Sequence, residues 1–233
     1  MWRSLFAFAG RMVPERCVIC GKVLAPGGCA DPPVCAGSCR QITPPDGVLC
    51  PVCGVPLSHA VGPCSRCTRS GYAFEFHRSL SLYRGRVRDL IIEMKFHRRR
   101  RVVLCFVEPI SNLVAGIEAD AIVPVPPSRS GRRRRGFDHV KNIARRVSRE
   151  RNIQFLPLLR RGRAPVQKTL NFTARLANMG AAIRVCAVLP GSARRVILVD
   201  DVFTTGATMS ACAAALKQRG ALEVFAVSLA MEP

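Results

Sequence analysis

The sequence contains no uninterrupted apolar stretch of about 18 residues, which is the length that a membrane-spanning helix requires. It also lacks a convincing signal peptide, because the apolar run from Leu5 to Gly10 is shorter than the ~7 to 15 residues of such a signal and Arg11 ends it without a small-x-small cleavage site. We expect a short amphipathic helix here that packs against the body of the protein. These absences argue against a membrane-spanning or exported protein and favour a cytoplasmic one.

Acidic residues are scarce, since 15 Asp and Glu stand against 36 Lys and Arg and leave a formal net charge of +21. Much of the excess lies in two arginine runs, Arg98–Arg101 and Arg132–Arg135. Such a balance favours polyanionic partners, which include nucleic acid, an anionic membrane surface and phosphorylated small molecules. A solvated basic surface without a specific ligand explains the same composition, so charge alone does not name the partner.

Hydrophobic residues, by contrast, make up 48% of the 233 residues. A chain of this length and composition is expected to fold, with one core of about 150 residues and a small additional unit. The cysteines indicate where the small unit lies, because nine of the twelve fall between Cys17 and Cys67. We therefore predict two domains, residues 1–70 and residues 71–233.

Three of the cysteine pairs have the spacing C-x-x-C, and glycine follows two of them. Two thiolates on one tight turn face a single ion only when the backbone folds back on itself, and glycine relieves the strain of that turn. Tetrahedral zinc binds two such pairs. Disulfide bonds would require an exported protein, and a redox motif would be a single pair beside a β-α-β unit. We therefore predict a structural zinc site formed by the last two pairs, Cys50, Cys53, Cys64 and Cys67.

The first zinc site is less regular, because three residues separate its second pair and Cys29 lies nearby as a competing ligand. Ligand pairing that interleaves the two sites remains open, and His59 is interpreted as a loop residue. A small proline-rich segment buries little apolar area, so zinc would supply its folding energy, and four thiolates leave no open position for a substrate. We assign this site to Cys17, Cys20, Cys35 and Cys39.

Beyond residue 71 the apolar pattern alternates between helical and strand periodicity. Helices are predicted over residues 85–96, 102–117, 138–151 and 207–218. Strands are predicted over residues 120–125, 155–159, 196–199 and 222–229, and a strand or hairpin over residues 74–83. Strands followed by helices, with continuous apolar runs in the strands, predict an α/β fold whose parallel sheet is flanked by helices on both faces. The remaining cysteines are expected in its core: Cys105, Cys186 and Cys212.

The stretch VILVDDVFTTGAT, residues 196–208, carries the strongest functional signal. Four apolar residues form a buried strand, and Asp200 and Asp201 follow at its expected carboxyl end, where ligands gather in parallel sheets. Thr204–Thr208 lead into the next helix, so their amides and hydroxyls would form an anion site that Gly206 opens to close approach. Two carboxylates beside a phosphate would repel it unless they bind another group. Vicinal ribose hydroxyls, with Mg²⁺ close by, are the natural partner. The motif predicts a sugar 5-phosphate site, with an ordinary threonine-rich helix cap as the alternative.

DDVFTTGAT is similar to the phosphoribosyl diphosphate (PRPP) motif of the type I phosphoribosyltransferases. The resemblance implies that the acidic pair binds the ribose hydroxyls and that the following loop binds the 5-phosphate through Val202, Phe203, Thr204, Thr205, Gly206, Ala207 and Thr208. It places a diphosphate loop directly after the strand predicted over residues 120–125, at Pro126, Pro127 and Ser128. Arg129 would meet the diphosphate, so the candidate catalytic residues are Asp200, Asp201 and Arg129.

More of the chain resembles a single family. Arg135-Gly-Phe-Asp-His139 is similar to the RGFNQ segment of the ComF family, and Gln167 with Arg175–Asn178 resembles a second stretch of it. The zinc pairs, Lys95-Phe96, the VPVP strand and DDVFTTGAT follow the order of that family along nearly the whole chain. The resemblance implies a double zinc ribbon, a type I phosphoribosyltransferase-like domain, and a role in DNA uptake by competent bacteria or in nucleotide-related metabolism.

The expected chemistry is phosphoribosyl transfer, which expels diphosphate from the anomeric carbon and needs Mg²⁺, cations and a lid that excludes water. We predict that Arg160–Phe172 is this mobile lid. No acid-base catalyst is evident, since His77, His97 and His139 are expected on the surface or in loops. Two departures from the family pattern, Asp138-His139 for Asn-Gln and Ala164 for threonine, affect the expected substrate contacts.

Two other functions fit the same sequence. A non-catalytic protein would bind single-stranded DNA through the zinc ribbons and Arg98–Arg101, and would use the PRPP pocket for a sugar-phosphate. A regulator would keep the PRPP pocket without catalysis. The acceptor, the oligomeric state and the presence of a DNA-uptake helicase as a partner are not specified by the sequence.

Overall fold

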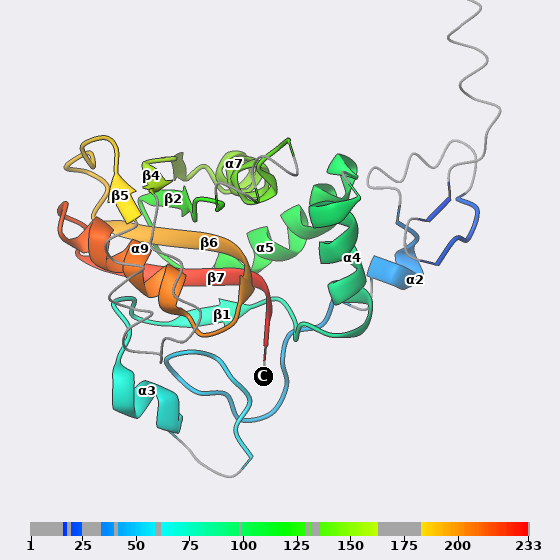
Figure 1. Ribbon diagram of the computed structural model, residues 1–233, viewed down its shortest axis with the longest axis horizontal. Helices are drawn as coiled ribbons and strands as arrows, with labels where there is room; N and C mark the ends of the chain where they lie inside the picture. The colour runs from blue at the N-terminus through cyan, green and yellow to red at the C-terminus, as the bar shows by residue number, and fades with distance from the viewer. Residues whose placement is uncertain are drawn as a thin grey trace, which may run out of the picture.

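The computed structural model describes residues 16–17, 20–24, 34–39, 42–58, 62–97, 99–128, 131, 136–162 and 183–232. Its centre is a five-stranded sheet with the order β1-β7-β6-β2-β3, in which every pair of neighbours is parallel (Figure 1). The strands are β1 (His77–Ser79), β2 (Ala121–Pro124), β3 (Gln154–Phe155), β6 (Arg195–Phe203) and β7 (Glu223–Met231). A separate antiparallel pair consists of β4 (Leu159–Arg161) and β5 (Ile183–Val185).

Helices cover both faces of the sheet (Figure 1). The described helices are α2 (Ala36–Cys39), α3 (Ser65–Ser70), α4 (Gly85–Phe96), the 3-10 helix η1 (Arg100–Phe106), α5 (Val107–Val114), α7 (His139–Arg151) and α9 (Ala207–Lys217). The predicted α/β class, with a parallel sheet between helices, is therefore confirmed. Within the described part of the chain, no helix is both long and apolar enough to cross a membrane.

Alternation along the strands divides the core into two layers, because successive strand residues point to opposite faces. Ile197 and Val199 of β6 face the layer that contains α4, η1, α5 and α7. Val196 and Leu198 face the other layer, which contains α9. All four of these residues are fully buried, as expected for a central parallel strand. Each helical layer therefore contacts its own set of β6 side chains.

The two cysteine clusters pack on different layers. Cys17 belongs to the core cluster that contains α4, and Figure 1 shows α2 beside that helix. Cys50 and Cys53 belong to the cluster that contains α9. The proposed division at residues 70 and 71 remains a prediction. At the second cluster His77 crosses this division, because its Nδ1–H donates a hydrogen bond to the Cys53 carbonyl oxygen (2.8 Å), while its Nε2 lies 2.9 Å from the Ser228 hydroxyl.

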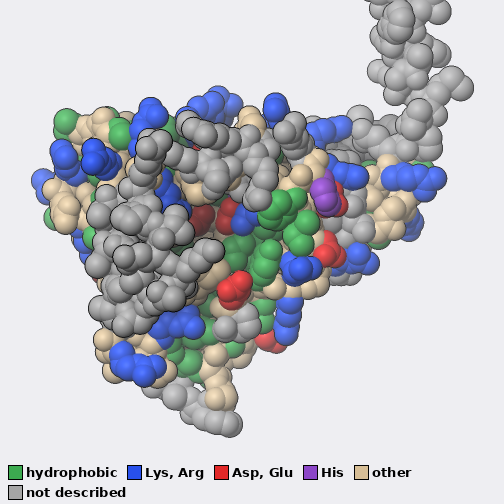
Figure 2. Space-filling view, viewed as in Figure 1, with side chains coloured by type: hydrophobic (Ala, Val, Ile, Leu, Met, Phe, Trp, Pro, Cys, Tyr) green, Lys and Arg blue, Asp and Glu red, His purple; other side chains and the backbone are tan. Residues whose placement is uncertain are grey.

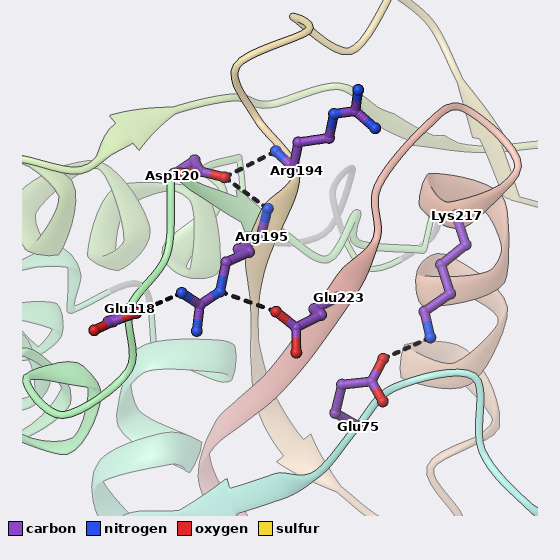
Figure 3. A network of polar contacts seen from close by, with 7 residues as sticks. All are labelled: Glu75, Glu118, Asp120, Arg194, Arg195, Lys217 and Glu223. Carbon is purple, nitrogen blue, oxygen red and sulfur yellow. Dashed lines mark hydrogen bonds and ion pairs between the residues drawn. The ribbon is translucent and has the colours of Figure 1, made fainter.

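A network of charges closes the amino-terminal end of the sheet (Figure 3). One carboxylate oxygen of Asp120 accepts hydrogen bonds from the backbone amides of Arg194 (2.8 Å) and Arg195 (2.7 Å). The Arg195 guanidinium also pairs with Glu118 (2.6 Å) and Glu223 (3.0 Å), so it joins the starts of β2, β6 and β7. The opposite end, where β2 and β6 finish, lacks this closure among the residues that the structure describes and contains the predicted ligand motifs.

Several predicted elements differ from the structure in length. The stretch predicted as one helix over residues 102–117 divides into η1 and α5, and the change falls just before Pro109, whose ring cannot occupy a helix interior. The strand predicted over residues 196–199 continues to Phe203, because its pairing with β7 extends to Phe203 and Met231. The single edge strand predicted over residues 155–159 divides into β3 and β4, which belong to different sheets.

Candidate functional site

The acidic pair lies inside β6 rather than beyond its end, so the two side chains project to opposite faces of the sheet. Asp201 faces the layer of α4 and α7. Its Oδ1 lies 2.7 Å from the ammonium of Lys95, and its Oδ2 lies 2.6 Å from Nε2 of His139. Burial acts to raise the pKa of Asp201, but the hydrogen bond from His139 and the charge of Lys95 outweigh it and hold the pKa well below its usual range. Asp201 is therefore a fixed anion.

Asp200 has a different environment on the other face. Its Oδ1 accepts a hydrogen bond from the backbone amide of Asp201 (2.8 Å). Burial, together with the charge of Asp201, raises the pKa of Asp200 to about 7. The adjacent carboxylates thus differ in protonation near neutral pH, and Asp200 is the one that exchanges a proton or a cation most easily.

The loop between β6 and α9 is shaped by close packing at Gly206. This glycine has φ +75°, and a Cβ atom there would lie 2.7 Å from ring atoms of both Phe203 and Tyr72. The conformation and the contact both require glycine. Because α9 begins at Ala207, the amides of Thr205 to Thr208 form the start of a helix of 11 residues, the type of position that binds anions.

Residues in or just after the second cysteine cluster hydrogen-bond to the backbone of this loop. The Arg66 guanidinium donates a hydrogen bond to the Thr204 carbonyl oxygen (3.1 Å), and the Tyr72 hydroxyl donates one to the Thr205 carbonyl oxygen (2.9 Å). The His77 ring stacks on Phe203, with ring centroids 3.9 Å apart. Both carbonyl oxygens are thus tied to residues in or just after the second cysteine cluster, and within the loop the Ala207 amide donates a hydrogen bond to the Thr205 hydroxyl (3.4 Å).

The second cysteine cluster fits a metal. The sulfur atoms of its four cysteines lie within 4.8 Å of one another. Three of their separations are 3.5, 3.6 and 3.7 Å, close to the ~3.8 Å edge of a tetrahedron with bonds of about 2.3 Å. In the absence of a metal, burial raises the pKa of the Cys53 thiol to about 11 and also raises that of Cys67, so a dication is needed to hold both as thiolates. The predicted zinc ligands Cys50, Cys53, Cys64 and Cys67 are thus brought together.

The first cluster is partly described. Cys17, Cys20 and Cys35 lie with their sulfur atoms within 4.8 Å of one another, and the Cys20 and Cys35 sulfur atoms are 3.6 Å apart. Cys39 lies on α2, but its side chain is outside the described residues, as is Cys29. Three of the four predicted ligands of this site are therefore in place for zinc.

The predicted diphosphate loop borders a large pocket. Pro126 and Pro127 line it at the end of β2, and its volume is about 710 Å³. The Ser128 hydroxyl accepts a hydrogen bond from the Gly131 amide (3.1 Å), which turns the chain after β2. Arg129 lies outside the described residues, as do the lid from residue 163 onward and the segments at Gln167 and Arg175–Asn178.

Three predictions about single residues are wrong. His77 and His139 are buried rather than on the surface, because each ring makes a hydrogen bond inside the protein, to Ser228 and to Asp201 respectively. Cys186 is exposed, because it follows the short strand β5 at the edge of the pocket rather than entering the core. Cys105, Cys212 and His97 lie as predicted, the two cysteines buried and the histidine exposed.

The structure also assigns partners that the sequence did not reveal. Lys95 and His139 come from two helices and meet on one carboxylate, although 44 residues separate them along the chain (139 − 95 = 44). An ion pair between distant helices leaves no local signal, so the sequence did not predict that Asp201 is held from the layer of α4 and α7.

These features define a class of α/β protein in which one strand carries an acidic pair and is followed by a Thr-Gly loop that starts a helix. The same chain carries cysteine clusters that fit zinc. No protein-family model matches the chain. Over 221 residues the chain is 31% identical to the DNA utilization protein YhgH of Escherichia coli (strain K12), covering 91% of this chain and 95% of that protein. It is 26% identical over 196 residues to the competence protein ComFC of Bacillus subtilis (strain 168), covering 80% of this chain and 77% of that protein. The chain belongs to the ComF family, as its motifs predicted.

Proposed function

We propose that the site at the end of β2 and β6 binds a 5-phosphoribosyl ligand, with PRPP as the reference compound. The observation that supports this most directly is the shape of the loop at Gly206, whose carbonyl oxygens at Thr204 and Thr205 are turned away and held. The loop amides and threonine hydroxyls would then bind the 5-phosphate. The resemblance to the PRPP motif supports the same ligand.

In this proposal the two aspartates have separate roles. Both oxygens of Asp201 already hold internal partners, so Asp201 fixes the geometry of the strand and its charge orients Lys95 and His139. Asp200 is then the carboxylate that would meet the ribose hydroxyls or hold Mg²⁺, which prefers oxygen ligands. The Pro126–Ser128 loop and Arg129 would meet the diphosphate. Mg²⁺ would supply charge neutralisation of the leaving diphosphate when a nitrogenous acceptor is present.

Titration calorimetry with PRPP and Mg²⁺ tests this assignment. We expect saturable 1:1 binding that requires Mg²⁺, and loss of at least about tenfold in affinity in Asp200→Asn, since one charge-assisted interaction contributes about 1.5 to 3 kcal/mol. Asp120→Asn is the matched control, because Asp120 lies at the opposite end of the sheet. Absence of PRPP binding by the wild-type protein at millimolar ligand would refute the proposal.

A second function, action on DNA, is favoured by the relatives and by charge. The relatives are named for DNA utilization and for competence, and the net charge of +21 suits a polyanion. We propose that this chain acts on single-stranded DNA during DNA uptake, with a DNA-uptake helicase as the partner class. Binding of a single-stranded oligonucleotide should weaken steeply with salt, and a flat dependence of log K on log salt would exclude it.

A further inference from the structure

The described surface of α7 carries a dense group of cations. Its buried face packs Val140, Ile143 and Val147 into the core, and its outer face presents Arg145, Arg146 and Arg149, all exposed. Among the described residues, none of these three arginines lies within ion-pair distance of a carboxylate. The Arg146 guanidinium donates a hydrogen bond to the Asn142 side chain (3.0 Å), which orders it along the helix. Such a face is positioned for an anionic partner.

This face is hollowed, and the hollow continues toward the candidate site. A depression of about 430 Å³ is lined by the α7 residues from Lys141 to Arg149 together with Phe137 and Asp138. The pocket of about 710 Å³ at the end of β2 shares Asp138 and Lys141 with it. The two spaces therefore meet at the first turn of α7. Figure 2 shows Lys and Arg side chains along the edge of the molecule where Figure 1 places α7 and β4.

A second, independent feature of the pocket points to an anion. Arg160 of β4 and Arg184 of β5 lie directly opposite each other in the antiparallel pair, and both line the pocket. Like charges directly opposite each other destabilise a strand pair. A phosphate group between them would remove this repulsion. The floor of the same pocket is apolar, with Pro126, Pro127 and Leu159, and would accept the flat face of a base.

The spacing of the cations selects the kind of partner. Residues four apart on a helix are about 6 Å apart along its axis, so Lys141, Arg145 and Arg149 extend over about 12 Å. A stacked nucleic-acid strand places about four phosphates in that length at ~3.4 Å each. An anionic membrane would instead need exposed apolar side chains beside the cations, whereas the apolar side chains of α7 face the core.

We propose that the α7 depression and the adjoining pocket form one continuous site for a single strand of DNA, with its phosphates along Arg145, Arg146 and Arg149 and a nucleotide between Arg160 and Arg184. This inference deepens the second function above and rests on it. It places the strand on α7 rather than on the zinc ribbons. A nucleotide in the pocket would lie beside the acidic pair, since Pro124 at the end of β2 pairs with Val199, the residue before Asp200.

The test compares two variants that lose equal charge. The first variant is Arg145→Gln/Arg146→Gln/Arg149→Gln, in which glutamine keeps a helix propensity close to that of arginine. The slope of log K against log salt for a 20-nucleotide single strand should become about 2 less steep, because each phosphate contact contributes about 0.7. Affinity near 0.1 M salt should fall about tenfold or more. The control, Arg69→Gln/Arg88→Gln/Arg219→Gln, removes three exposed arginines from α3, α4 and the end of α9 and should keep the wild-type slope.

A second variant tests the pocket. Arg160→Gln/Arg184→Gln should weaken DNA binding while raising the midpoint of thermal unfolding, because it removes a repulsion that only the ligand offsets. Equal DNA binding by the α7 variant and the wild type would overturn the inference, as would an equal loss in the control variant. Tighter binding of RNA of the same sequence than of DNA would also overturn the inference. So would binding of phosphatidylglycerol vesicles that the α7 variant weakens, if the same variant leaves DNA binding unchanged. If the wild type binds no single strand at all, the second function itself fails.

Discussion

Asp200 and Asp201 are neighbours in the sequence, yet replacing each by asparagine is expected to change stability in opposite directions. The pKa of Asp200 is raised from 3.8 to about 7 by burial and by the charge of Asp201. Between these two values the folded protein binds more protons than the unfolded chain, so the free energy of unfolding falls as pH rises. Asp200→Asn removes this titration and keeps the oxygen that accepts the hydrogen bond from the Asp201 amide.

The magnitude follows from the same pKa values. At 1.36 kcal/mol per pKa unit, the raised pKa of Asp200 lowers the free energy of unfolding by about 2 kcal/mol at pH 5, where only the unfolded chain is ionised, and by about 4 kcal/mol at pH 8, where both states are ionised. We therefore expect Asp200→Asn to be more stable than the wild type by these amounts. The pKa of Asp201 is lower in the folded protein than in the unfolded chain. Its ionised carboxylate therefore stabilises the fold fully above the unfolded-state pKa, and this stabilisation is lost as pH falls through the folded-state pKa. Asp201→Asn leaves the Lys95 ammonium, 16% exposed, without its carboxylate, and should lose about 2 to 4 kcal/mol at pH 8.

Urea unfolding of the wild type and both variants at several pH values from 5 to 8 measures these differences. At each pH the three proteins contain the same cysteines, so thiol titration and zinc release affect them equally. The reasoning is refuted if Asp200→Asn is less stable than the wild type at pH 8, or if its advantage does not grow with pH. Asp200→Asn should also bind PRPP at least about tenfold more weakly, which would identify Asp200 as a residue retained for ligand binding at a cost in stability.

Two further predictions concern the loop and the metal. Gly206→Ala should lower the free energy of unfolding by about 2 to 4 kcal/mol and abolish PRPP binding, because φ is +75° and the new Cβ would meet Phe203 and Tyr72. The control in the same unfolding assay is Gly191→Ala, whose new Cβ would meet nothing within 4 Å. Equal stability of the two variants would contradict the packing argument. Cys53→Ser should reduce the zinc content measured by elemental analysis by one equivalent. The control Cys186→Ser, at an exposed cysteine, should leave the zinc content unchanged. Zinc loss in both variants or in neither would contradict the assignment of the second zinc site.

Much of the fold could be predicted from the sequence because its signals are local. The helix over residues 85–96 agrees with α4, and the motif at residues 196–208 lies on β6, the loop and α9 as expected. The C-x-x-C pairs at Cys50 and Cys64 also predicted their cluster, because ligand spacing is itself a local pattern. What escaped prediction depends on contacts between distant segments. The burial of His139 depends on Asp201, and the strand β5 is recognisable only beside β4.

The boundary of β6 illustrates a different limit. Apolar residues ended at Val199, so the sequence predicted that the strand ended there, but hydrogen bonding with β7 continues through two charged residues. At Asp201 the layer of α4 and α7 supplies the partners, Lys95 and His139, that stabilise an acidic side chain inside the strand. The sequence contained all three residues and gave no indication that they meet.

The hydrogen bonds from Arg66 to Thr204 and from Tyr72 to Thr205 join segments 138 and 133 residues apart. Closing so large a loop is entropically costly, and the closure depends on an early segment whose cysteine cluster fits a metal. The order of events during synthesis follows from this. The cysteine-rich segment emerges first, and the Thr-Gly turn can pack on it only after residues 204 and 205 have been made. If zinc orders that early segment, we expect chains made without zinc to lack the support that holds this turn.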